Sequence, residues 1–226
     1  MPELQALAPN LWVVDTPHRF LGLHLGSRMT VVRLKSGKVV LHSPVALSAE
    51  LAERINAIGP VRHIVCPNRF HHMYAAQAVA AFPEALLHGP AALHKKRRDL
   101  KFDALLSATP HPDWQGELLP LTIDGSLLNE TVFYHPDSRS LITCDLVENF
   151  HRCTHTPTRW YLRLGGILGR VGWHPLLRPL YLNRRRARDS INRLLNWPFE
   201  RVILSHGNII QGDAHRAIRD GLAWLY

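Results

Sequence analysis

The succession of strand and helix signals constrains this chain more than any other feature. Three short segments rich in β-branched residues come first: Leu11–Asp15, Thr30–Leu34 and Lys38–His42. Such composition favours strands. Helical and strand patterns then alternate to the end of the chain, with more strands than one doubly wound sheet needs. We therefore predict an α/β fold, a four-layer αββα sandwich in which two sheets pack face to face with helices outside.

Capping and breaking residues set the boundaries of the first elements. Ser48 is a typical N-cap for a helix over residues 49–58. A buried strand is predicted over Val61–Cys66, and a helix from His71 or His72 to Ala81. Further strands are expected over Ala85–His88, Leu118–Ile123, Glu130–His135, Ser140–Cys144 and Arg201–Ser205, and further helices over Arg184–Asn196 and from an Asp213 cap to Trp224.

Length and cysteine content indicate one intracellular domain. A chain of 226 residues with 46% hydrophobic residues suits a single domain over residues 1–226. No apolar run approaches the ~20 residues that a membrane span needs, and the first ten residues lack the features of a secretory signal. The three cysteines, Cys66, Cys144 and Cys153, are an odd number. We therefore expect reduced thiols and a cytoplasmic location.

The net charge of +9 is concentrated in one segment, residues 152–188. This segment holds nine arginines, no lysine and no acidic residue, whereas the other 18 basic residues match 18 acidic ones. Leucines and aromatic residues are interspersed, a composition found at interfaces. We interpret it as a cap over an active-site mouth or as an interface, for instance in a homodimer. A membrane surface, a nucleic acid or other phosphate-bearing partner, and a merely solvated face are the alternatives.

Potential ligand residues follow three of the predicted strands. They lie in the stretches Cys66–His72, Thr143–Asp145 and Ser205–Gly207. Loops at strand ends carry side chains held by a rigid sheet, and functional groups collect there. Histidine and aspartate are suitable ligands for zinc, iron or manganese. The three stretches are therefore candidates for a metal site.

The order of these motifs resembles that of the metallo-β-lactamase superfamily. Its members carry H-x-H-x-D-H at a strand end, then an aspartate that commonly bridges two metals, then a last histidine. Here His71-His72, Asp145 and His206 match the ends of that series. The segments LxSGKVVLHSP, VxHIVCPNxFHH, FYHPDSRSLITCDLVEN and WPFERVILSHGNII are similar to the uncharacterised DUF4336 branch. The resemblance runs from about Leu11 to the C-terminus and implies the αββα fold.

The departures from the superfamily motif imply that the usual two-metal site is degenerate. The three histidines that hold one metal are replaced here by Pro67, Arg69 and roughly Asp124. The ligands implied for the other metal are His71, His72, Asp145 and His206. This set suits one Zn or Fe ion. The alternative is a metal-free site in which these groups hydrogen-bond each other.

The resemblance also implies catalytic roles for two residues. A metal at this site would lower the pKa of its water toward ~7, and Asp145 is expected to orient that water. Arg69 is expected to stabilise a developing oxyanion or to hold a substrate carboxylate or phosphate. Adjacent residues point in different directions, so His71 and His72 need not both face the metal.

Three functions agree with these features. The first is a mononuclear metal-dependent hydrolase of a small anionic ester, thioester or lactone. The second is a metal-free binding or scaffold protein on the same fold, because fold alone does not determine function. The third is nucleic-acid binding through the arginine-rich segment, which would weaken steeply with salt. Bound metal separates the first from the second.

Overall fold

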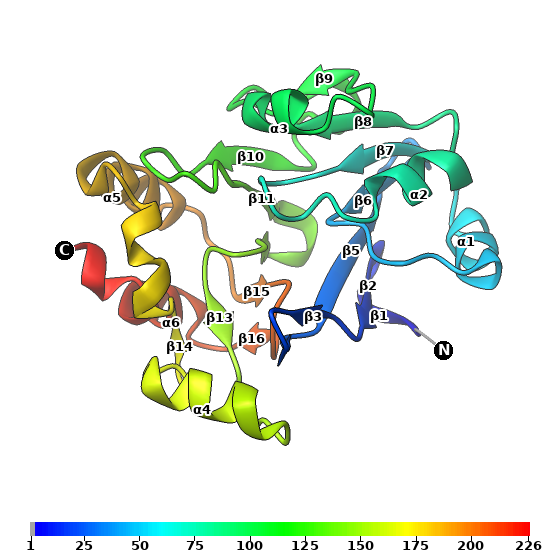
Figure 1. Cartoon of the computed structure of the whole chain (residues 1–226). Coiled ribbons are helices and arrows are strands. Elements are labelled where there is room, and N and C mark those ends of the chain that lie inside the picture. Colours follow the sequence, from blue (N-terminus) through cyan, green and yellow to red (C-terminus); the bar gives the residue numbers. More distant parts are fainter. Residues whose placement is uncertain (1–2) are drawn as a thin grey trace.

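A computed structural model describes residues 3–226 and contains two large β-sheets packed face to face between helices (Figure 1). The first sheet consists of seven strands in the order β1 (Leu4–Ala8), β2 (Leu11–Thr16), β5 (Ser27–Arg33), β6 (Val39–His42), β7 (Val61–Val65), β8 (Leu86–Gly89) and β9 (Ala104–Leu105). The strands from β1 to β6 pair antiparallel, and those from β6 to β9 pair parallel. The predicted αββα sandwich is confirmed.

Three helices connect the parallel strands and cover the outer face of this sheet. They are α1 (Ala49–Asn56), α2 (Ala75–Ala81) and α3 (Ala91–Lys96). The predicted cap of α1 is confirmed, since the Ser48 side chain accepts a hydrogen bond from the backbone N–H of Leu51. Because β6 and β7 run parallel, both end at the same edge of the sheet. The loop after each strand therefore lies at that edge.

The second sheet brings two further strand ends together. Its five strands are, in order, β10 (Leu119–Thr122), β11 (Thr131–His135), β12 (Ser140–Ile142), β15 (Arg201–Ile203) and β16 (Ile210–Gln211). Strands β12 and β15 pair parallel, with Ile142 opposite Ile203. Helices α5 (Arg184–Leu194) and α6 (Ala214–Gly221) pack on the outer face. The loops after β12 and β15 consequently lie side by side.

Alternating side chains fill the space between the sheets. Val40 and Val65 of the first sheet meet Phe133, Ile142 and Ile203 of the second in one apolar cluster. The residues between them on each strand face the outer helices, because successive side chains of a strand point to opposite faces. The sheets are thus fixed to each other by apolar burial, and the strand-end loops face one another across one edge.

Residues 148–181 and the hairpin at residues 19–24 contain elements that the sequence did not predict. These are β13 (Glu148–Asn149), α4 (Thr156–Leu164), β14 (Val171–Gly172), a 3₁₀ helix over Pro175–Leu180, and the hairpin of β3 (Arg19–Phe20) and β4 (Leu23–His24). Strands of two residues are too short to show an alternating pattern. Across residues 3–226, no helix is both long and apolar enough to cross a membrane.

One predicted helix start and one predicted helix cap were wrong. Helix α2 begins at Ala75 rather than at His71 or His72, because the side-chain oxygen of Asn68 accepts hydrogen bonds from the N–H groups of the next turn. Asp213 stands before α6, but its backbone is left-handed (φ 41°) and its side chain caps no N–H. Its carboxylate therefore does not support the helix in the predicted way.

Two buried histidines carry hydrogen bonds between strands β7 and β8. His63 Nδ1 lies 3.0 Å from His88 Nε2, and His63 Nε2 lies 3.0 Å from Asp113 Oδ2. Burial lowers the pKa of His63 to about 4, despite its hydrogen bond to Asp113, and lowers the pKa of His88 to about 3. Both rings are therefore neutral near pH 7.

Acid should destabilise the protein through this pair. Both folded-state pKa values lie below the ordinary 6.5, so the unfolded chain binds protons that the folded chain does not. The contribution of the two histidines to the free energy of unfolding is fully present above pH 6.5. It is lost as the pH falls, and at pH 5 the loss is about 2 kcal/mol per histidine. Urea unfolding at pH 7 and pH 5 measures the loss. His88→Gln should reduce this loss of stability between pH 7 and pH 5. His151→Gln, at an exposed position, should leave the loss unchanged. Equal stability of the wild type at both pH values would contradict the assignment.

Candidate metal centre

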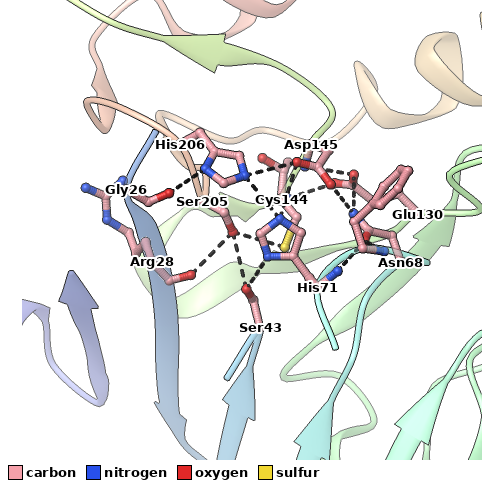
Figure 2. A network of polar contacts seen from close by, with 12 residues as sticks. Gly26, Arg28, Ser43, Asn68, His71, Glu130, Cys144, Asp145, Ser205 and His206 are labelled. Carbon is pink, nitrogen blue, oxygen red and sulfur yellow. Dashed lines mark hydrogen bonds and ion pairs between the residues drawn. The ribbon is translucent and has the colours of Figure 1, made fainter. Parts of the chain in front are cut away.

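Three strand-end loops bring His71, Asp145 and His206 together (Figure 2). His71 follows β7, Asp145 follows β12 and His206 follows β15. The Nε2 atoms of the two histidines are 3.2 Å apart, and they lie 3.3 Å and 3.2 Å from Asp145 Oδ1. The three side chains are almost entirely removed from solvent, with about a tenth of each exposed. We call these residues the triad.

The spacing of the triad fits three ligands of one tetrahedral metal ion. Ligands bound about 2.0–2.1 Å from Zn²⁺ at tetrahedral angles lie about 3.3 Å from one another. The three contacting atoms form a triangle with sides of 3.2, 3.2 and 3.3 Å. Two imidazoles and one carboxylate are also a known donor set for zinc. The residues present would therefore fit a single ion at the wall of the adjoining cavity.

Each histidine of the triad is oriented through its second nitrogen. His206 Nδ1 lies 2.7 Å from the carbonyl oxygen of Gly26, which can only accept, so Nδ1 must carry a hydrogen. In the neutral ring Nε2 then offers its lone pair. His71 Nδ1 lies 2.7 Å from the hydroxyl of Ser43. Contacts of this kind are typical of histidines that bind metal.

The backbone around these partners is held in strained or crowded conformations. Ser43 has φ 59°, which is unusual for a residue with a side chain. Gly207 has φ 93°, and a Cβ there would lie 2.1 Å from the carbonyl oxygen of Asn149. The buried Arg28 donates to the carbonyls of Leu204 and Gly207 at 2.8 and 3.0 Å. These contacts fix the loop that carries His206.

A buried amide joins the histidine loop to the loop of Asp145. Asn68 Nδ2 donates to Asp145 Oδ2 at 2.8 Å and to Glu130 Oε2 at 3.2 Å. Its oxygen accepts from the N–H groups of Phe70 and His71. Glu130 in turn accepts from the N–H groups that follow β12, at 2.7 and 2.9 Å. Sequence reasoning missed both Asn68 and Glu130, and the only available signal was the position of Asn68 in the strand-end loop.

Burial and charge set the protonation of this network. Burial would raise the pKa of Asp145, but the charge of His71 and the hydrogen bonds from both imidazoles hold it well below its usual range. Burial opposes the charged form of His206, yet its hydrogen bond with Asp145 raises its pKa. Burial, followed by repulsion from Asp145, raises the pKa of Glu130 to about 7. Asp145 is thus the ionised carboxylate, and Glu130 is the carboxyl group that takes up a proton near neutral pH.

Two of the predicted site residues lie elsewhere. His72 was expected as a fourth ligand, but its Nδ1 lies 2.9 Å from Arg97 Nη1, because successive residues of this turn point in opposite directions. Arg69 was expected to face the reacting groups. Among the residues that the structure describes, however, Arg69 is not one of those that line the adjoining cavity. Its guanidinium donates to the carbonyl of Leu127 at 3.4 Å. Asp124 pairs with Arg193 at 3.7 Å.

Two further groups near the triad were not predicted. His18 and Glu148 line the cavity that adjoins it. Burial, followed by the charges of His206 and His71, lowers the pKa of His18. Burial raises the pKa of Glu148 to about 7, and within residues 3–226 its Oε2 has no hydrogen-bond partner. Glu148 therefore places a buried carboxyl group with a pKa near neutral at the cavity wall.

A second group, His63, His111 and Asp113, also has ligand atoms within 4.8 Å of one another. It is less suited to a cation. Lys38 Nζ lies 2.7 Å from the Asp113 oxygen that contacts His63, so the carboxylate already has a positive partner. Both nitrogens of His63 are also engaged in hydrogen bonds.

Solved metallo-β-lactamases share the fold of the whole chain. The enzyme from Pontibacter korlensis has a TM-score of 0.69 at 16% identity, covering 100% of this chain and 99% of that one. The enzyme from Hirschia baltica has a TM-score of 0.67 at 12% identity, covering 99% and 97%. FIM-1 from Pseudomonas aeruginosa, in a mono-zinc form, has a TM-score of 0.65 at 13% identity, covering 99% and 94%.

The chain therefore has the metallo-β-lactamase fold. In sequence, residues 9–94 match the family described as a domain of unknown function, DUF4336. That stretch contains both histidines that follow β7 and ends in α3. No curated protein matches the sequence. The predicted resemblance to the superfamily and to its DUF4336 branch is confirmed.

The Asn68 bridge should be essential to stability. Asn68→Ala removes the donor shared by Glu130 and Asp145 and leaves two buried carboxyl groups facing each other, so we expect a loss of about 3 kcal/mol in the free energy of unfolding. Asn56→Ala, at an exposed helix end, should change it by less than about 0.5 kcal/mol. Urea unfolding near neutral pH compares the two variants. Equal stabilities would show that the bridge has no structural role.

Proposed function

We propose that this protein is a hydrolase with a single metal ion, held by His71, Asp145 and His206. The observation that carries the proposal is the triangle of ligand atoms, with sides near 3.3 Å and histidines oriented through their second nitrogens. The mono-zinc form of FIM-1, a protein of the same fold, supports the idea that this fold can hold one zinc ion. The reaction class that we propose is hydrolysis of an ester, thioester or lactone.

When bound, a metal ion of this kind supplies Lewis acidity and makes water a nucleophile near neutral pH. The chain's own residues orient the metal ligands and accept the proton. Asn68 holds Asp145 through Oδ2 and so leaves Oδ1 for the metal. Gly26 and Ser43 fix the two imidazole rings. We assign Glu148, whose side chain lines the adjoining cavity, as the group that would accept a proton during hydrolysis, since a general base works best with a pKa near the working pH.

The neighbouring histidines His71 and His72 provide a matched test of the metal site. His71→Ala and His206→Ala should lower the affinity for zinc by more than about 100-fold, because each removes one of three ligands. His72→Ala should change it by less than about threefold. Zinc per chain, measured by mass spectrometry after equilibration with zinc and gel filtration, gives the result.

Other outcomes of that measurement would separate the competing functions. About one zinc per wild-type chain agrees with the proposal. Two per chain would mean that the histidine loop binds a second ion and that the assignment is wrong. If the protein binds no zinc, even after reconstitution, the hydrolase proposal is rejected and the metal-free binding or scaffold protein remains as the alternative. Salt-dependent binding of nucleic acid in that case would point to the exposed arginines that begin α5.

Glu148 gives a separate prediction about the reaction. Glu148→Gln keeps the size of the side chain but cannot accept a proton, so kcat for an ester such as p-nitrophenyl butyrate should fall about 100-fold. Zinc content should remain unchanged. The rise of the wild-type rate through pH 7, where Glu148 loses its proton, should disappear in this variant. Glu53→Gln, on the exposed face of α1, is the control; a Glu148→Gln enzyme of full activity would remove the assignment.

A further inference from the structure

A cavity of about 370 Å³ adjoins the triad. Its inner wall includes His71, Asp145 and His206, and most of the rest of the wall comes from three separate parts of the chain. These are the hairpin of β3 and β4, the turn before α2, and the segment 152–188. One water molecule occupies ~30 Å³ in the liquid. At that volume for each non-hydrogen atom, the cavity holds roughly a dozen such atoms.

Apolar side chains form most of the wall beyond the triad. Leu25 comes from the β3–β4 side, Tyr74 from the turn before α2, and Tyr161, Trp173 and Leu177 from the segment 152–188. This segment therefore contributes its aromatic and leucine side chains to the cavity. In the part of the chain that the structure describes, none of its nine arginines lines the cavity.

The charges at the wall disfavour an anionic ligand. No lysine or arginine between residues 3 and 226 lines the cavity, whereas two carboxyl groups, those of Asp145 and Glu148, do. Away from the triad, a substrate carboxylate or phosphate would be desolvated without a lysine or arginine to pair with, which is costly. An uncharged carbonyl compound avoids this cost.

The rim of the cavity is apolar and solvent-exposed. Phe20 is 50% exposed, Leu21 87%, Met73 60% and Leu176 75%, and all four line the cavity. Leu21 and Gly22 form the tip of the hairpin with φ 48° and 80°. Such turns usually place asparagine, aspartate or glycine where Leu21 stands, because a left-handed backbone is unfavourable for leucine. Leu21 is thus a large apolar residue at a strained, exposed position of the cavity lining. Exposed apolar clusters of this kind mark binding sites.

We propose that this cavity binds the uncharged hydrocarbon part of the substrate, so that the protein acts on neutral esters, thioesters or lactones with an aliphatic or aromatic group of roughly a dozen atoms. This inference rests on the proposed hydrolytic function for its reaction, but the binding of the hydrocarbon group depends on the cavity alone. It replaces the anionic substrate expected from the sequence. The segment 152–188 then serves as a cap with an apolar inner face.

Binding can be tested without any reaction. The neutral fluorophore 2-naphthol, which is close to the size of roughly a dozen non-hydrogen atoms that the cavity holds, should bind the purified protein at one site, and decanol should displace it about tenfold better than decanoate. Leu176→Asp and Leu21→Asp should weaken probe binding about tenfold, since each places a charge at the rim, and aspartate tolerates the backbone at position 21. Leu182→Asp is the matched control, because Leu182 is 71% exposed but does not line the cavity.

The outcomes separate this inference from the proposed function. No probe binding, stronger displacement by decanoate, or equal weakening by Leu182→Asp would overturn the inference. Zinc content should be the same in all three variants. For the wild-type protein, kcat/KM for p-nitrophenyl esters should rise about tenfold or more from the acetate to the octanoate. Probe binding without zinc or hydrolysis would reject the hydrolase but keep the apolar site. Hydrolysis that prefers short or charged esters would keep the hydrolase and reject the apolar site.

Discussion

The arrangement of the candidate site depends on the bridge from the Asn68 amide to two buried carboxyl groups. Asn68 belongs to the loop after β7 in the first sheet, whereas Glu130 and Asp145 belong to the second. Apolar burial between the sheets brings their edges together, but it is not directional. The amide hydrogen bonds supply the direction, because they place Asp145 Oδ1 against the nitrogen of His71. In a buried network each partner must be satisfied, so the positions of these groups are mutually dependent.

The distribution of charge separates the inside of the site from its surroundings. Asp145, Glu130 and Glu148 are buried carboxyl groups in a protein with a net charge of +9. The arginines of the segment 152–188 remain outside the cavity, and the aromatic and leucine side chains of the same segment line it. Guanidinium groups keep their hydration at the surface while apolar groups leave water. One amphipathic segment therefore gives the protein a basic exterior and an apolar chamber.

Agreement in fold at 12–16% identity shows what the shared architecture requires and what it leaves free. The layers need only alternating apolar positions, helices that cover the outer faces, and turns at the right places. The strand-end loops are free to vary, because loops add little to the core. Pro67 and Arg69 stand in the histidine loop without disturbing the fold. Function must therefore be argued from the side chains that the loops present.

The sequence alone determined the layers, most strand positions, the Ser48 cap and the strand ends that carry His71, Asp145 and His206. These features depend on local propensity and on the period of apolar residues, which near neighbours control. The tertiary structure alone decided that His71 rather than His72 joins the triad, that Arg69 turns away, and that Asn68, Glu130 and Ser43 orient the site. It also decided that the cavity is apolar. The direction of a side chain in a turn depends on backbone angles and on partners more than sixty residues away, and no local pattern records those.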